Sequence, residues 1–190
     1  MAARGARRAQ GARAQGTRTV APARRALSTP HGFGPLRSGD HVRGPDGAPL
    51  VFVYADFTCP HCALTHARLE EMDVRRVFRH LALRTKHPRS VALAHAAEAA
   101  ARQDAFWAFH DSLYADQGRL DDPHLWERCE ALGLDVDRFE ADRRSADVAA
   151  RVQRDVREAV MAGAMTTPTL VGGDQAAARL VATMPRVRNE

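Results

Sequence analysis

Apolar residues along this chain form two kinds of pattern, short continuous runs and stretches with helical spacing. The run over 50–55 is apolar and β-prone, which is typical of a buried strand. A looser alternation predicts a second strand over 74–83, and a third short strand is predicted over 167–171, before two glycines. The last two predicted strands are separated by a long region with helical spacing.

That region is interrupted by residues that start or stop helices. Asp104, Asp122 and Ser145 each precede a stretch with helical spacing and are predicted to cap a helix. The order of elements is strand, helix, strand, a block of helices and strand, which predicts an α/β fold. Helices are predicted over 63–72, 90–101, 104–114, 122–133, 136–143, 145–163 and, more briefly, 176–182.

Charge is distributed unevenly over the 190 residues. The pI is about 9.8, but residues 1–39 hold eight arginines and no acidic residue, whereas residues 40–190 hold the remaining 20 basic residues and all 23 acidic ones. The basic character therefore belongs to an N-terminal arm, and no nucleic-acid partner is expected for the domain. No apolar run approaches the roughly 20 residues of a membrane span, so none is expected.

The arm lacks apolar periodicity, which predicts disorder over 1–39 and one folded domain over 40–190. A misassigned upstream start codon in a GC-rich gene would produce the same composition. No apolar segment follows the twin arginines at 7–8 or 24–25, so no secretory signal is expected and a cytoplasmic location is predicted. An Arg-rich transit peptide has a similar composition and stays open as an alternative.

The most specific chemistry lies in Cys59-Pro60-His61-Cys62, where the first strand ends and the first helix begins. Backbone N–H groups at the start of a helix are unpaired and the helix dipole is positive there, so a thiolate is stabilised. The imidazole of His61 is expected to lower the pKa of Cys59 further. This layout predicts a thiol–disulfide redox site.

A zinc site is the main alternative for the same residues. Cys59, Cys62 and His66 have a spacing that zinc ligands can adopt, and the nine histidines offer candidates for a fourth ligand. No second Cys-x-x-Cys pair completes a four-ligand set, so the strand–helix setting favours redox chemistry and no metal or cofactor is expected.

Several motifs occur in an order that resembles one family. Asp-Phe-Thr-Cys-Pro-His-Cys at 56–62 is followed by Phe-Trp-Ala-Phe-His-Asp at 106–111 and by Thr-Thr-Pro-Thr at 166–169. This order is similar to that of DsbA-like thioredoxin-fold proteins, over roughly residues 40–171. The segment 40–45 resembles a subgroup in which the domain stands alone or is fused to a sodium/proton antiporter.

The resemblance implies a thioredoxin fold with a helical insertion, about 88–145, between the second and third strands. It implies that Cys59 is the nucleophile, that Cys62 resolves the mixed disulfide, and that Pro60 and His61 tune the thiol. It also implies that Thr167 and Pro168, joined by a cis bond, form a substrate-binding loop against the dithiol. The expected partners are protein or peptide thiols and disulfides, together with a redox partner. The sequence identifies neither this redox partner nor the oligomeric state.

The chain departs from the family pattern at two places. Many relatives have a buried acid six residues before the first cysteine, where this chain has Val53. The family also continues after its last loop strand with a partner strand and a helix, whereas here only 176–182 has helical character, so an open strand edge is expected. These departures favour a second alternative, a redox-inactive module that binds peptides.

Overall fold

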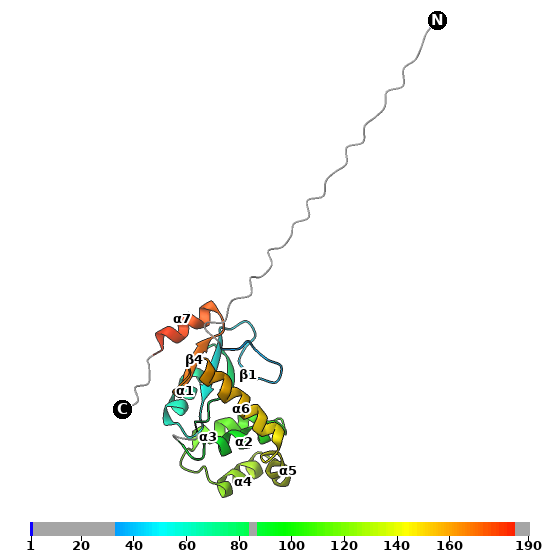
Figure 1. Cartoon of the computed structure of the whole chain (residues 1–190), viewed down its shortest axis with the longest axis vertical. Helices are drawn as coiled ribbons and strands as arrows, with labels where there is room; N and C mark the ends of the chain where they lie inside the picture. Colours follow the sequence, from blue (N-terminus) through cyan, green and yellow to red (C-terminus); the bar gives the residue numbers. More distant parts are fainter. Residues whose placement is uncertain (2–32, 84–86, 185–190) are drawn as a thin grey trace.

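The structure is a computed structural model that describes Met1, residues 33–83 and residues 87–184. A four-stranded mixed sheet in the order β1-β3-β2-β4 forms its centre, and helices cover both faces (Figure 1). The elements in chain order are β1 (His41–Arg43), β2 (Leu50–Ala55), α1 (Pro60–Glu70), β3 (Arg75–His80), α2 (Ser90–Ala101), α3 (Phe106–Ala115), α4 (Asp122–Ala131), α5 (Val136–Asp142), α6 (Ala146–Met161), β4 (Thr169–Gly172) and α7 (Gln175–Thr183).

β2 is the central strand and is buried along almost its whole length. It pairs in parallel with β3 through Phe52 and Val77, and antiparallel with β4 through Phe52 and Val171. The strand predicted over 50–55 is confirmed, whereas β3 is shorter than predicted and β4 starts two residues later. β1 pairs antiparallel with β3 and was not predicted, because three residues are too few to carry an alternating pattern.

The alternation along β2 divides the core into two layers. Val51 and Val53 pack with residues of α1 and α7 on one face of the sheet. Phe52 and Tyr54 face the opposite side, where they pack in one cluster with Ala159 of α6. The end of β2 therefore lies between two apolar layers, one on each face of the sheet. The candidate site comes directly after this end of the strand.

Along the chain, helices α2 to α5 come between β3 and β4, within the insertion predicted over 88–145. They lie together below the sheet in the view of Figure 1. Ser145 caps α6 as predicted, whereas α4 is capped by Asp121, one residue before the predicted Asp122. The predicted cap at Asp104 is wrong. Its backbone has φ 59°, and α3 begins after Ala105 without a side-chain cap hydrogen bond.

Among the described residues, Phe33 already contacts the sheet side of the fold, before the domain start predicted at Asp40. The Phe33 ring lies 5.1 Å from the ring of Tyr54, between centroids, on the α6 side of the sheet. Residues 33–39 therefore pack against the folded domain. The prediction of disorder falls, for residues 2–32, outside the described residues.

A buried charge network holds this segment in place. Arg79 of β3 is fully buried and donates to a carboxylate oxygen of Asp40 at 2.8 Å and to the Tyr54 hydroxyl at 3.0 Å. Arg37 in turn donates to Asp155 of α6 at 2.7 Å. A buried guanidinium needs such partners, so the segment before β1 is part of the fold rather than of a solvated tail.

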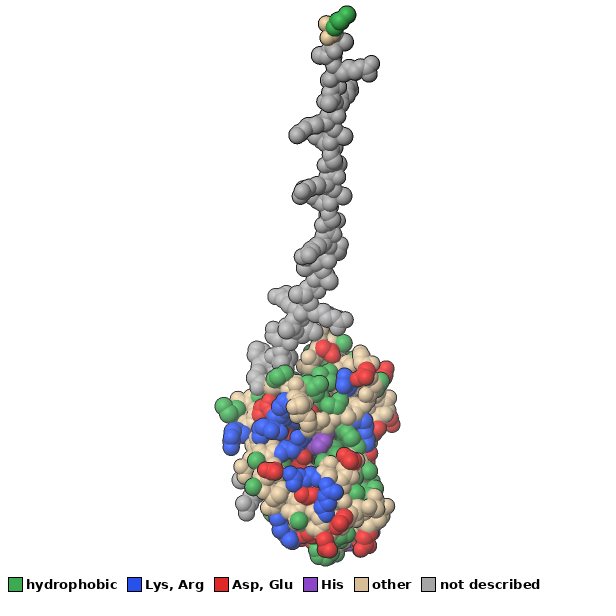
Figure 2. Space-filling view, turned by 90° about the vertical axis from the view of Figure 1, so that its right-hand side faces the viewer, with side chains coloured by type: hydrophobic (Ala, Val, Ile, Leu, Met, Phe, Trp, Pro, Cys, Tyr) green, Lys and Arg blue, Asp and Glu red, His purple; other side chains and the backbone are tan. Residues whose placement is uncertain are grey.

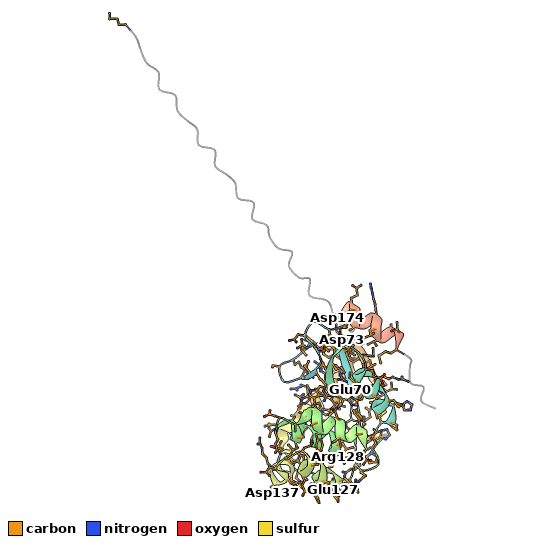
Figure 3. The ribbon with its side chains drawn as sticks, turned by 180° about the vertical axis from the view of Figure 1, so that it is seen from behind. Glu70, Asp73, Glu127, Arg128, Asp137 and Asp174 are labelled. Atoms are coloured by element: carbon orange, nitrogen blue, oxygen red, sulfur yellow. The ribbon has the colours of Figure 1, made fainter. Side chains whose placement is uncertain are left out.

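β4 lies at the edge of the sheet, and no strand within 33–83 or 87–184 pairs with its outer edge, as expected. α7 follows directly, in agreement with the helix predicted over 176–182. Asp174 caps this helix and also accepts a hydrogen bond from the backbone N–H of Leu50 at 2.9 Å (Figure 3). A Cβ at Gly172 would lie 2.2 Å from the backbone nitrogen of Ala178, so only glycine allows α7 to pack this closely on β4.

Basic and acidic side chains are interspersed over the face of the folded part in Figure 2, in line with the nearly balanced charge of residues 40–190. No helix within the described ranges combines the length and hydrophobicity that a bilayer span requires.

Candidate active site

Cys59 lies at the junction between β2 and α1, where the sequence predicts it. It is the N-cap residue of α1, with an extended backbone, and Pro60 occupies the first turn. Proline fits this position because its missing N–H would have no partner in the first turn of a helix. The sulfur of Cys59 is thereby placed at the positive end of the helix dipole.

The surroundings of Cys59 favour its thiolate. A hydrogen bond from the side chain of Cys62 lowers the pKa of Cys59 to about 5, against the opposing effect of burial. The Thr167 hydroxyl and the backbone N–H groups of Cys62 and His61 lower this pKa further. These contacts favour the thiolate form of Cys59 at neutral pH, the form in which a cysteine can act as a nucleophile.

The surroundings of Cys62, in contrast, favour the protonated thiol. Only 2% of its surface is exposed, and burial together with the neighbouring Cys59 raises its pKa far above the ordinary value. The backbone N–H of Asp56 donates to its sulfur at 3.5 Å. The pair thus consists of one activated thiolate and one buried thiol that keeps its proton.

The loop before β4 faces the cysteines. The Thr167–Pro168 peptide bond is cis, and the carbonyl oxygen of Thr167 lies 3.5 Å from the sulfur of Cys59. Because β4 pairs antiparallel with β2, the loop before β4 lies beside the end of β2, where the chain continues to Cys59. Thr167 and Pro168 are therefore placed at the dithiol, as the family resemblance implied.

His61 lies beside the dithiol and acts on Cys59 through its backbone. Its backbone N–H contributes to the low pKa of Cys59, whereas its imidazole Nδ1 is buried without a hydrogen-bond partner among the described residues. The effect of the imidazole on the thiol stays a prediction.

Three residues that the sequence analysis did not single out support the site from the helical insertion. Gln117 donates to the carbonyl oxygens of Phe57 at 2.7 Å and of Cys59 at 3.1 Å. The Tyr114 hydroxyl and the Ser90 hydroxyl each bond to Asp56, at its carbonyl and its carboxylate respectively. No local pattern marks these residues, because only the packing of the insertion brings them to the loop.

The zinc alternative requires Cys59, Cys62 and His66 to converge. In the described part of the chain, the cluster with metal-ligand spacing is formed by His66 with His110 and Asp111 of α3. One ligand atom of each residue lies within 4.8 Å of the other two, and the cluster includes neither cysteine. Asp111 is paired there with Arg43 at 2.6 Å, and a guanidinium at this position disfavours a second cation.

The comparisons with known proteins agree with this geometry. A family model described as thioredoxin matches residues 37–180. The chain belongs to the thioredoxin family. Its structure is DsbA-like, with the helical insertion that the motifs implied.

Two solved structures illustrate the likeness. A thioredoxin-like oxidoreductase from Silicibacter pomeroyi superposes with a TM-score of 0.67 at 24% identity, over 78% of this chain and 95% of that one. Pseudomonas aeruginosa DsbA2 superposes with a TM-score of 0.56 at 25% identity, over 74% and 90% of the two chains. Both likenesses support a DsbA-like thioredoxin fold for this chain.

Relatives found by sequence comparison carry the name of a transporter. The Na(+)/H(+) antiporter NhaA 3 of Salinispora tropica is 45% identical over 139 residues, which are 68% of this chain and 21% of that protein. NhaA of Herminiimonas arsenicoxydans is 42% identical over 137 residues, 68% of this chain and 22% of that protein. The chain thus spans about a fifth of the length of these relatives.

Proposed function

We propose that this thioredoxin-family protein exchanges thiols and disulfides with protein or peptide substrates through Cys59 and Cys62. The observation that carries the proposal is the opposite effect of the site on the two cysteines. The pKa of Cys59 is lowered to about 5, while that of Cys62 is raised. An exchange reaction needs this division, because one sulfur must attack as a thiolate and the other must wait until a mixed disulfide has formed.

The reaction follows from this division in two steps. The Cys59 thiolate attacks one sulfur of a substrate disulfide, forms a mixed disulfide and releases the other substrate sulfur as a thiolate. Cys62 then loses its proton and attacks Cys59, which closes the Cys59–Cys62 disulfide and releases the second substrate thiolate. The same steps in reverse oxidise a substrate dithiol.

The low pKa of Cys59 favours the oxidising direction. A stabilised thiolate favours the reduced form of the protein, so the Cys59–Cys62 disulfide is a stronger oxidant than an ordinary disulfide. In this direction each turnover leaves Cys59 and Cys62 reduced. The proposal therefore includes a redox partner that restores their disulfide.

The Thr167–Pro168 loop supports a peptide as substrate. The Thr167 carbonyl faces the Cys59 sulfur, and β4, which follows the loop, has an open outer edge among the described residues. An extended peptide can pair with backbone groups exposed in this way. Backbone pairing would place a substrate cysteine beside Cys59 with little dependence on its neighbouring side chains.

Two cysteine variants test the proposal. Cys59→Ser is expected to abolish the reduction of insulin and the oxidation of a dithiol peptide, whereas Cys62→Ser is expected to accumulate mixed disulfides with the substrate. Cys129→Ala is the matched control, because Cys129 is buried in α4 and burial raises its pKa to about 11. If the wild type shows no turnover and Cys62→Ser traps nothing, the redox-inactive peptide-binding module is the better explanation.

A further inference from the structure

A small cavity lies directly behind Cys62, between α1, the sheet and α3. Its volume of about 20 Å³ is enough for roughly one water molecule. Val53 forms part of its apolar wall. The lining contains no carboxylate, but it contains two imidazoles, those of His66 and His110, and the phenol of Tyr114.

Cys62 needs a proton acceptor in this cavity. Burial and the neighbouring Cys59 raise its pKa, so it remains a thiol until it attacks the mixed disulfide. A thiol attacks only after losing its proton, and no carboxylate lines the cavity to accept that proton. The candidates are therefore the side chains that share the cavity with the sulfur.

His110 and Tyr114 are poor acceptors. Burial lowers the pKa of His110 to about 4, and its Nδ1 is already engaged at 2.9 Å by Asp111. Burial raises the pKa of Tyr114 well above its ordinary value, so its hydroxyl keeps its proton. Neither group gains a proton in the core without cost.

His66 has the properties that the other two lack. It lies one helical turn after Cys62 on α1, and its side chain is 16% exposed, so it reaches both the cavity and solvent. Burial lowers its pKa, so it is the free base at neutral pH. Its nitrogens lie 3.5 Å from Asp111 and 3.7 Å from Glu70, and these carboxylates would stabilise the imidazolium (Figure 3 shows Glu70).

Charged groups from the neighbouring strands moderate this effect. Arg43 of β1 pairs with Asp111 at 2.6 Å and with Glu70 at 2.8 Å, and Arg76 of β3 pairs with Glu70 at 2.7 Å. Both arginines disfavour a positive charge on His66. An imidazolium formed there would therefore be short-lived. This suits a group that passes a proton on to solvent, because such a group must release the proton readily.

We propose that His66 accepts the proton of Cys62 during the resolving step, through one water in the cavity that both side chains line, and passes it to solvent. In this step the S–H bond of Cys62 breaks and its proton moves to an imidazole nitrogen of His66. The Cys62 sulfur bonds to that of Cys59, while the mixed disulfide breaks and its electron pair leaves on the substrate sulfur. The inference rests on the proposed exchange function and names the residue that accepts the proton of Cys62.

Single-turnover kinetics of the reduced full chain with dithiobis(nitrobenzoate) separate the two steps. A first release of nitrothiobenzoate reports attack by Cys59, and a second release reports attack by Cys62. His66→Gln is expected to leave the first phase unchanged and to slow the second about 10²-fold, the lower end of general base catalysis. His124→Gln is the control, because this histidine lies at the start of α4 and contacts Asp121 rather than the cavity.

The pH profile separates a chemical role from a structural one. The second phase of the wild type should slow as the pH falls through the lowered pKa of His66, below its ordinary 6.5. His66→Gln should lack this decline, and added imidazole should restore part of the rate. An unchanged second phase in His66→Gln, or a slower phase with the wild-type pH profile, would overturn the role of His66. If the wild type shows no second phase, the exchange function itself is wrong, and the inference with it.

Discussion

The sulfur of Cys59 lies 3.5 Å from the carbonyl oxygen of Thr167, although 108 residues separate the two in the sequence. Cys59 owes its position to the start of α1, and Thr167 owes its position to the pairing of β4 with β2. The contact therefore joins a local feature, the helix terminus, to a long-range one, the sheet. Both contribute to the reactivity of the thiol, because the Thr167 hydroxyl also lowers the pKa of Cys59.

The first prediction concerns this pKa. Thiolate absorbance of the reduced protein should titrate with a midpoint near pH 5, because the helix start and the Cys62 thiol stabilise the anion. The titration in Cys59→Ser should lack this step, which assigns it to Cys59. A midpoint close to the ordinary value of a free thiol would contradict the activated nucleophile.

The second prediction concerns stability. The pKa of Cys59 is lower in the folded protein, about 5, than its ordinary value of 9.0. The contribution of the thiolate to stability is therefore complete above the ordinary value and is lost as the pH falls toward 5. At pH values above the ordinary pKa of a cysteine, Cys62 has the opposite effect on stability. Its pKa is raised in the folded protein, so its ionisation opposes folding.

Urea unfolding of the reduced protein between about pH 5 and pH 9 measures this contribution. The difference in unfolding free energy between the wild type and Cys59→Ser should grow with pH over this range. A difference that does not change with pH would show that the folded protein does not stabilise the thiolate.

The third prediction concerns the buried charge network beside β3. Arg79→Leu should lower the unfolding free energy by about 3–5 kcal/mol, because it leaves the buried Asp40 carboxylate without its main partner. Arg144→Ala, a change at an exposed arginine of the insertion, should stay within about 0.5 kcal/mol. Equal effects of the two variants in urea unfolding would contradict the structural role of the network.

The fourth prediction concerns the loop that carries Cys59. Gln117→Leu removes the donor to the carbonyl oxygens of Phe57 and Cys59 and should cost about 1–3 kcal/mol, since both acceptors lose a partner. It should also speed hydrogen exchange at the start of α1. Gln153→Leu on the exposed face of α6 is the matched control and should change neither quantity.

Much of the local structure could be predicted from the sequence. The strand at 50–55, the cap at Ser145 and the helix after Cys59 follow from apolar spacing and from residues with strong local preferences. The prediction of a cap at Asp104 failed, because this residue has a left-handed backbone between α2 and α3, which local preferences do not reveal. β1 is too short for its three residues to show a pattern.

The sequence by itself determined the dithiol and its place at a strand–helix junction, because helix starts and buried strands are encoded by neighbouring residues. Only the tertiary structure decided what surrounds the two sulfurs. Thr167 reaches Cys59 through the register of β4, and His110 meets His66 through the packing of α3 on α1. Such contacts depend on register and side-chain packing between distant segments, and neither has a local signature in the sequence.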